Sequence, residues 1–157
     1  MTFTQAEALA FVTRLRADGQ TVVFTDGIFD LLHPGHLRCL QQARRLGDAL
    51  IVGVSSDRSV GRSRSGGRPT MPDLERAEVL AALAPVDSVV IVDDDTPYAI
   101  IKALKPDVLV KGGDWSEDAI VGRDLVLGGG GRVVRVPFEA GYSTTRIIQI
   151  AQKRERA

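Results

Sequence analysis

Both histidines of this chain fall in one four-residue segment, His33-Pro34-Gly35-His36, which follows the apolar, β-branched run at 21–25. Pro34 favours the start of a helix. A helix start offers unpaired N–H groups and the positive end of the helix dipole, which together can hold phosphate oxygens. Two imidazoles three residues apart can both reach one phosphate, and Gly27 and Gly35 let the backbone approach it closely. The pattern predicts a phosphate site. The alternative is two surface histidines beside a turn, with Asp30 as a local cap.

A second candidate site is Tyr142-Ser143-Thr144-Thr145-Arg146, where a hydroxyl cap opens the last expected helix. The segment would combine another helix start with side-chain donors for phosphate oxygens. Taken alone, these residues are more typical of a plain helix cap.

Two further segments carry polar residues that could contact a ligand. Lys111-Gly112-Gly113-Asp114-Trp115 follows an expected strand, and Trp115 suits either a ligand contact or a core anchor. Residues 57–70 are rich in Gly, Ser and Arg and predict a mobile loop. Its arginines could close over phosphates with fork-shaped donors, or the loop could simply be solvated; they are Arg58, Arg62, Arg64 and Arg68.

Strands and helices are expected to alternate along the chain. The apolar runs predict five strands, at 21–25, 49–54, 88–92, 107–110 and 132–137. Helical spacing and Pro/Gly punctuation predict helices at 4–16, 34–46, 72–84, 96–104, 117–127 and 144–154. This order predicts an α/β, Rossmann-like, doubly wound parallel sheet covered on both faces. Ligands of such sheets bind beyond the carboxyl ends of the strands, where the candidate segments fall.

Length and composition narrow the class of protein. The 157 residues predict one domain, with an N-terminal helix at 1–20 and a catalytic core at 21–152. A formal net charge of zero argues against a broad nucleic-acid surface. A single cysteine, Cys39, forms no internal disulfide and reads as packing. The absence of a signal-like or membrane-spanning run predicts a cytoplasmic protein that does not enter membranes.

The motifs resemble a known superfamily. A strand followed by G-x-F-D-x-x-H-x-G-H, here 27–36, resembles the nucleotidyltransferases that include cytidylyltransferases and pantetheine-phosphate adenylyltransferase. Over about 21–152 the chain is similar to the adenylyltransferase domain of bacterial ADP-heptose synthesis. Segments that carry this closer resemblance include 46–48, 56–57, 68–69, 107–114 and 143–145.

The resemblance implies a reaction of ATP with D-glycero-β-D-manno-heptose 1-phosphate that releases pyrophosphate. It implies a Mg²⁺ ion, or another divalent cation, bound mainly through the ATP phosphates, and a homodimer. It implies catalytic roles for His33, His36, Arg64 and Arg68 and substrate contacts by Arg76 and Trp115. Nucleotide or phosphate contacts are implied for Gly27, Ile28, Phe29, Asp30, Gly35, Lys111, Gly112, Asp114, Ser143, Thr144 and Thr145.

Some residues depart from the family's pattern. Asp26 adds a negative charge near the expected phosphate site; we expect it to bind substrate, through a ligand hydroxyl or by helping to hold a metal. Gly61 and Arg64 stand where the family's loop commonly has lysines. Asp93-Asp94-Asp95 reads as a solvated acidic turn rather than a metal site.

Other functions remain open at the level of sequence. Relatives that use CTP and glycerol 3-phosphate typically carry an arginine before the S-T-T element, and its absence at 137–145 favours ATP. A cytidylyltransferase acting on a small phosphate, a flavin-mononucleotide adenylyltransferase and a non-catalytic nucleotide-binding regulator are the alternatives. In some relatives the domain is fused to a sugar kinase, and we expect this chain to act alone.

Overall fold

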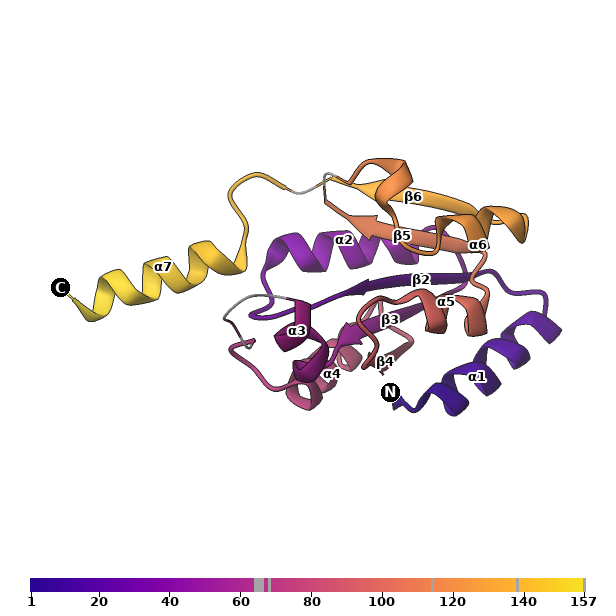
Figure 1. The fold of residues 1–157 in the computed structure, drawn as a ribbon, viewed down its shortest axis with the longest axis horizontal. Helices are drawn as coiled ribbons and strands as arrows, with labels where there is room; N and C mark the ends of the chain where they lie inside the picture. Colours follow the sequence, from indigo (N-terminus) through magenta and orange to yellow (C-terminus); the bar gives the residue numbers. More distant parts are fainter. Residues whose placement is uncertain (64–66, 68, 114, 138, 157) are drawn as a thin grey trace.

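Six parallel strands form one sheet in the order β1-β4-β3-β2-β5-β6 (Figure 1). The computed structural model describes residues 1–63, 67, 69–113, 115–137 and 139–156. The strands span Thr2–Phe3 (β1), Val22–Gly27 (β2), Ala49–Ser55 (β3), Ser88–Val92 (β4), Val108–Gly112 (β5) and Arg132–Val136 (β6). The predicted α/β class with a parallel sheet is confirmed. The count of five strands was one short, because β1 has only two residues and too short a pattern to show a period.

The strand order reverses beside β2. From β2 the chain runs outward through β3 and β4 on one side, then returns to place β5 and β6 on the other. The register pairs Thr25 with Val110 and Gly27 with Val54. The carboxyl ends of β2, β3 and β5 therefore meet at one edge of the sheet, which is where doubly wound sheets bind ligands.

Helices cover both faces of the sheet and hold two core clusters. On one face, α2 (Pro34–Arg44) and α4 (Asp73–Ala81) contribute buried Leu40 and Leu80. On the other, α1 (Gln5–Ala17), α5 (Tyr98–Leu104) and α6 (Arg123–Gly128) bury apolar side chains against β2, β3 and β5. Strand residues are buried on both faces, as in Val23 and Phe24, because a parallel sheet covered by helices has no solvated side.

Two local expectations were wrong. The start of the predicted loop 57–70 is a helix, α3 (Asp57–Ser63), whose polar side chains are tied to the turn after β4. The predicted helix 117–127 is interrupted: a 3₁₀ turn, Glu117–Ala119, is followed by Gly122 at φ 86°, and only then by α6. A left-handed residue cannot continue a helix, so the pattern alone overstated its length.

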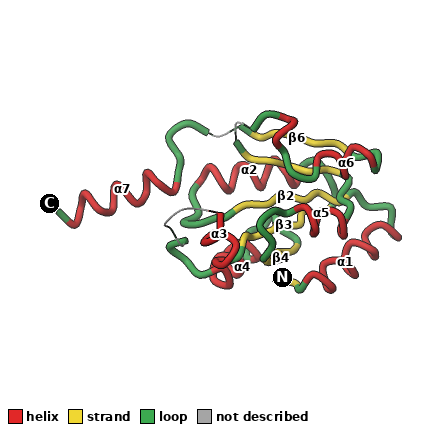
Figure 2. The backbone as a smooth tube through the Cα atoms, in the orientation of Figure 1, coloured by secondary structure: helices red, strands yellow, loops and turns green. Residues whose placement is uncertain are grey.

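The last helix, α7 (Thr144–Glu155), extends away from the sheet as an arm (Figures 1 and 2). None of its residues is buried, and Ile147 and Ile150 are exposed. Its first turn contacts the loop that follows β2, where the Thr144 hydroxyl donates to the carbonyl of Asp30.

Candidate active site

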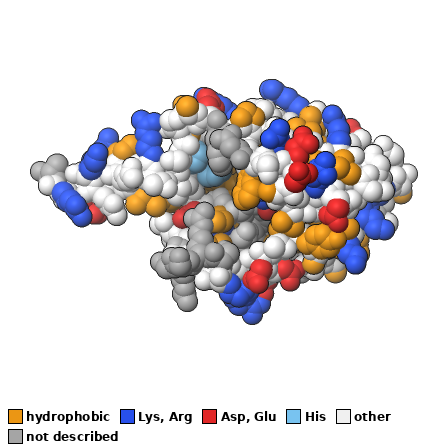
Figure 3. Space-filling model, turned by 45° about the horizontal axis from the view of Figure 1, so that its top comes forward, with side chains coloured by type: hydrophobic (Ala, Val, Ile, Leu, Met, Phe, Trp, Pro, Cys, Tyr) orange, Lys and Arg blue, Asp and Glu red, His pale blue; other side chains and the backbone are white. Residues whose placement is uncertain are grey.

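His33 and His36 lie with their rings stacked at the start of α2. Their ring centroids are 3.9 Å apart with an interplanar angle of 26°. Phe29 supports the inner ring, with its centroid 5.5 Å from that of His36. A Cβ on Gly35 would lie 2.9 Å from Cε1 of His33, so only glycine leaves room for this ring. The local sequence thus fixes both imidazoles at the helix start, and Figure 3 shows a patch of histidine surface (pale blue) where the C-terminal arm meets the rest of the molecule.

The hydrogen bonding of His33 fixes its proton. The backbone N–H of Gly35 donates to Nδ1 of His33 over 3.1 Å, so Nδ1 is an acceptor. A neutral imidazole that accepts at Nδ1 carries its proton on Nε2. His33 therefore offers an Nε2–H donor to a ligand, as a phosphate site at a helix start requires.

His36 is held neutral and incompletely paired. Burial, the nearby His33 and, in the opposite direction, Asp30 together lower the pKa of His36 from 6.5 to about 4. Burial also lowers the pKa of His33. Nδ1 of His36 is buried without a hydrogen-bond partner among the described residues. A buried polar atom without a partner is costly, and such atoms often mark places where a ligand completes the bonding.

The turn between β2 and α2 is conformationally strained. Phe29 and Leu31 have φ angles of 52° and 41°, in the left-handed region that bulky residues avoid. Strain of this kind persists where surrounding structure enforces it, and it is concentrated at functional sites. The turn leads into the two histidines. It also contains the backbone carbonyls of Asp30 and Leu31, which accept from the Thr144 hydroxyl of α7.

The structure brings the second candidate segment to this turn. The Thr144 hydroxyl donates to the carbonyl of Asp30 over 2.5 Å. Ser143 caps α7 by accepting from the N–H of Arg146 at 3.1 Å. The start of α7, with its Ser143 and Thr145 hydroxyls, therefore lies beside the start of α2. The sequence placed these segments more than 100 residues apart, and the fold makes them one site.

An open groove of about 410 Å³ runs from this pair of helix starts along α7. Its lining includes His33, Tyr142, Arg146 and Ile147. Tyr142 stacks toward His33 with ring centroids 6.5 Å apart, and the Arg38 guanidinium lies 5.2 Å from the Tyr142 centroid. Sequence reasoning missed Arg38, and it included Tyr142 and Arg146 in the second candidate segment without giving either residue a role of its own. The available signal was that Tyr142 and Arg146 flank the S-T-T element.

Asp26 and Lys111 form an ion pair at the ends of β2 and β5. Lys111 Nζ lies 3.0 Å from Asp26 Oδ2, and the side chains are 18% and 12% exposed. The same ammonium lies 5.4 Å from the ring centroid of Trp115, which is 45% exposed. Trp115 is therefore a surface side chain and not the core anchor that was one of its two readings.

Gly112 lies directly beneath α2, where an added Cβ would lie 3.3 Å from Sγ of Cys39.

Two other expected contact residues are engaged within the protein. The Asp30 carboxylate accepts from the N–H groups of Thr70 and Met71, at 2.7 and 3.1 Å. Arg76 is 1% exposed and donates to Met71 O, to Ile28 O and to Asp57 Oδ1. Both residues thus hold the strained turn in place, which is a positioning role. Direct contacts from Asp30 or Arg76 to a ligand stay predictions.

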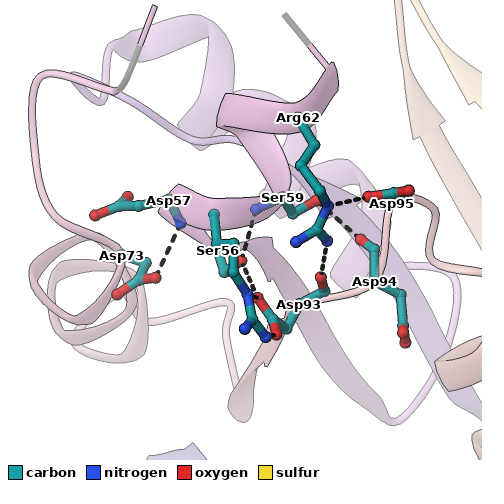
Figure 4. A network of polar contacts seen from close by, with 9 residues as sticks. Ser56, Asp57, Ser59, Arg62, Asp73, Asp93, Asp94 and Asp95 are labelled. Carbon is teal, nitrogen blue, oxygen red and sulfur yellow. Dashed lines mark hydrogen bonds and ion pairs between the residues drawn. The ribbon is translucent and has the colours of Figure 1, made fainter.

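The basic residues of α3 are paired with the acidic turn after β4 (Figure 4). Both Arg58 and Ser56 donate to the Asp93 carboxylate, and Arg62 donates to Asp95. Ser59 donates to the carbonyl of Asp94 over 2.8 Å. The acidic turn thus anchors α3 while Asp94 and Asp95 stay exposed to solvent, as expected for an acidic surface turn. Three expected site residues, Arg64, Arg68 and Asp114, lie outside the described residues.

Comparison with known proteins identifies the family. Residues 24–150 match the family described as cytidylyltransferase-like. The chain belongs to this family. It is 52% identical over 134 residues to the bifunctional protein HldE of Syntrophotalea carbinolica, covering 85% of this chain and 27% of that protein. It is 49% identical over 146 residues to the HldE of Koribacter versatilis, covering 93% and 30%. The chain spans less than a third of the length of these curated relatives.

Solved structures agree with this family assignment. The lipopolysaccharide core biosynthesis protein from Thermoplasma volcanium superposes with a TM-score of 0.67 at 27% identity, covering 77% of this chain and 99% of that one. Pantothenate synthetase from Thermus thermophilus gives the same TM-score at 21% identity, covering 99% of this chain and 70% of that one, and shows the shared fold. The motif-based resemblance to nucleotidyltransferases is confirmed.

Two features are absent from the residues that the structure describes. No helix there has the length and apolar character needed to cross a membrane. No three His, Cys, Asp or Glu side chains there are grouped so that they could bind a metal ion. The expected cytoplasmic location stays a prediction.

Proposed function

We propose that this chain is an adenylyltransferase that joins ATP and D-glycero-β-D-manno-heptose 1-phosphate to give ADP-heptose and pyrophosphate. The observation that carries the proposal is the stacked pair of His33 and His36 at the start of α2, linked through Thr144 to the start of α7. Identities of 49–53% to bifunctional HldE proteins, together with the family's motifs, support the choice of donor and acceptor.

The reaction is a displacement at the α-phosphorus of ATP. An oxygen of the sugar 1-phosphate forms a new bond to this phosphorus, and the bond to the pyrophosphate oxygen breaks. The attacking oxygen is already anionic, so the protein needs no strong base. Its work is to align the two phosphates and to stabilise the charge on the α-phosphate and the departing pyrophosphate.

The described residues provide donors suited to that work. Nε2–H of His33 and an N–H of neutral His36 can donate to phosphate oxygens, as can the hydroxyls of Ser143 and Thr145. Arg146 adds a positive charge at the start of α7, in the groove that His33 lines. A divalent cation carried by ATP would neutralise part of the triphosphate charge. Such a cation, held through the ATP phosphates, needs few protein ligands.

The family assignment also favours a second candidate, a cytidylyltransferase acting on glycerol 3-phosphate or another small phosphate. The experiment that separates the two is a pyrophosphate-release assay of the purified chain with Mg²⁺. ATP, CTP, GTP and UTP are crossed with heptose 1-phosphate, glycerol 3-phosphate and flavin mononucleotide. We expect turnover with ATP and heptose 1-phosphate. Turnover with CTP and glycerol 3-phosphate instead would refute the substrate assignment, and binding of a nucleotide without turnover would favour the non-catalytic regulator.

The proposal includes a homodimer. The α7 arm supports it, since a 12-residue helix with exposed Ile147 and Ile150 gains little stability by itself in water. Light scattering coupled to gel filtration measures the mass directly. We expect about twice the 16.9 kDa of one chain; a mass of one chain at micromolar concentration contradicts the dimer.

A further inference from the structure

We propose that Asp26, held by Lys111, is a hydroxyl-recognition residue that sets which polyol ligand the enzyme accepts. The ligand hydroxyl belongs either to the ribose of the nucleotide or to the sugar of the acceptor. This inference rests on the proposed function, and it deepens it by assigning specificity to a residue near the carboxyl end of β2.

The position of the pair points to ligand binding. Asp26 and Lys111 end two neighbouring strands, β2 and β5, at the place where the strand order reverses. Ligands of open α/β sheets bind in the crevice at this place. Asp26 is the next-to-last residue of β2, just before Gly27, so it lies close to the turn that leads to the stacked histidines.

A contribution to the stability of the fold does not by itself explain why Asp26 and Lys111 form a charged pair at this place. Both side chains are largely buried, and taking two charges out of water costs free energy that their attraction often fails to offset. Apolar residues of similar size would fold at least as well at such positions. A polar role at the ligand crevice explains why charges stand there.

A small cavity beside Asp26 has the size of one hydroxyl group. Its volume is about 20 Å³, enough for one water molecule, and its lining includes Asp26, Gly53, Ser55 and Thr96. Asp94 and Asp95 also line it. An acidic lining of this kind disfavours a phosphate oxygen, whereas the Asp26 carboxylate can accept a hydrogen bond from an O–H group. Phosphate is therefore the wrong occupant, and a hydroxyl is the right one.

The pair itself is complementary to sugar hydroxyls. Asp26 Oδ1 has no hydrogen-bond partner among the residues that the structure describes, so it can accept from a ligand. Lys111 uses one donor on Asp26 Oδ2 and keeps further N–H groups for a neighbouring oxygen. The half-exposed Trp115 ring beside Lys111 provides an apolar face for the C–H side of a sugar ring. The acceptor of Asp26, the donors of Lys111 and the aromatic face of Trp115 thus occur together at one end of the crevice.

Calorimetric titration of the full chain tests this assignment by a cycle of ligand and protein changes. The ligands are ATP with its 2′-deoxy and 3′-deoxy analogues, and the sugar 1-phosphate with its singly deoxygenated analogues. The proteins are the wild type, Asp26→Asn and the control Asp18→Asn. Asp18 follows α1 and precedes the start of β2, so this control removes the same charge at the opposite end of the strand.

We expect the wild type to bind one deoxygenated ligand about tenfold or more weakly than its parent, as a site built around a hydroxyl should. Asp26→Asn should lose most of that ratio, and Asp18→Asn should keep it. The ligand series that shows the effect identifies whether ribose or acceptor sugar is read. A general structural role of Asp26 would change both affinities together and leave the ratio intact.

Two results overturn the inference, and they differ in what they say about function. Unchanged ratios in Asp26→Asn for every analogue, in a protein that still turns over, refute the inference alone. Absence of binding by nucleotides and sugar phosphates alike refutes the inference together with the proposed function.

Discussion

Two polar regions of this protein differ in how completely their groups are paired. In the region of α3, the side chains of Ser56, Ser59, Arg58 and Arg62 all donate to the acidic turn at 93–95 (Figure 4). At the start of α2, Nδ1 of His36 is buried without a partner in the described part of the chain, beside a strained turn. Paired groups stabilise the fold by themselves, whereas an unpaired buried group beside a strained turn is typical of a place where a ligand binds. We therefore place chemistry at α2 and support at α3.

Among the tests of this comparison, the substitution His36→Ala has the largest expected effect. We expect kcat/KM for pyrophosphate release to fall about 10²–10³-fold, as when one donor to a developing charge is removed. The free energy of unfolding should change little, because the substitution removes a buried polar atom that has no partner. Gln41→Ala, on the exposed surface of the same helix, is the matched control. Equal losses of activity in both variants would show that the histidine has no special role.

Thr144→Val tests whether the link between α2 and α7 matters. The substitution keeps the shape of the side chain but removes the O–H that donates to Asp30 O. We expect kcat/KM to fall about tenfold, because the donors at the start of α7 lose their alignment with the histidines. Thr13→Val is the control, since its hydroxyl also donates to a backbone carbonyl, Leu9 O at 2.8 Å, on α1. An unchanged rate for Thr144→Val contradicts a shared site.

Asp93→Asn examines the paired region. The Asp93 carboxylate accepts from both Ser56 and Arg58 but is 44% exposed, which weakens the ion pair. We expect urea denaturation to show a loss of about 1–2 kcal/mol in the free energy of unfolding. Asp94→Asn is the control, because only the carbonyl of Asp94 takes part in the network. For Asp93→Asn we expect kcat/KM to stay within about twofold; a much larger loss would mean that α3 belongs to the active site.

The pH dependence of stability tests whether His36 is buried and neutral. The pKa of His36 is lowered from 6.5 to about 4 in the folded protein, so between these values the unfolded chain binds more protons. The free energy of unfolding should therefore be fully present above pH 6.5 and fall as the pH drops toward 4. His36→Asn should show a shallower fall than the wild type in urea titrations at pH 4.5 and 7. Identical slopes in the two proteins would contradict a buried, neutral His36.

Most of the fold could be predicted because its signals are local. Apolar runs such as 49–54 mark strands, and proline and glycine mark the ends of helices such as α2. The predictions failed where contacts with distant parts of the chain outweighed the local sequence pattern. Residues 57–63 have the composition of a loop but form α3, since the turn at 93–95 binds their side chains. The two residues of β1 are a strand only because β4 lies beside them.

For the site, the sequence by itself determined which groups could do chemistry: both histidines at one helix start, and hydroxyls before the last helix. Composition cannot say which polar groups remain free, because pairing depends on residues far apart in the chain. Only the tertiary structure decided that Arg76 and Asp30 hold the turn, that Lys111 is paired with Asp26, and that Thr144 reaches Asp30. The physical reason is that hydrogen bonds and ion pairs act over a few ångströms, and the fold alone sets those distances.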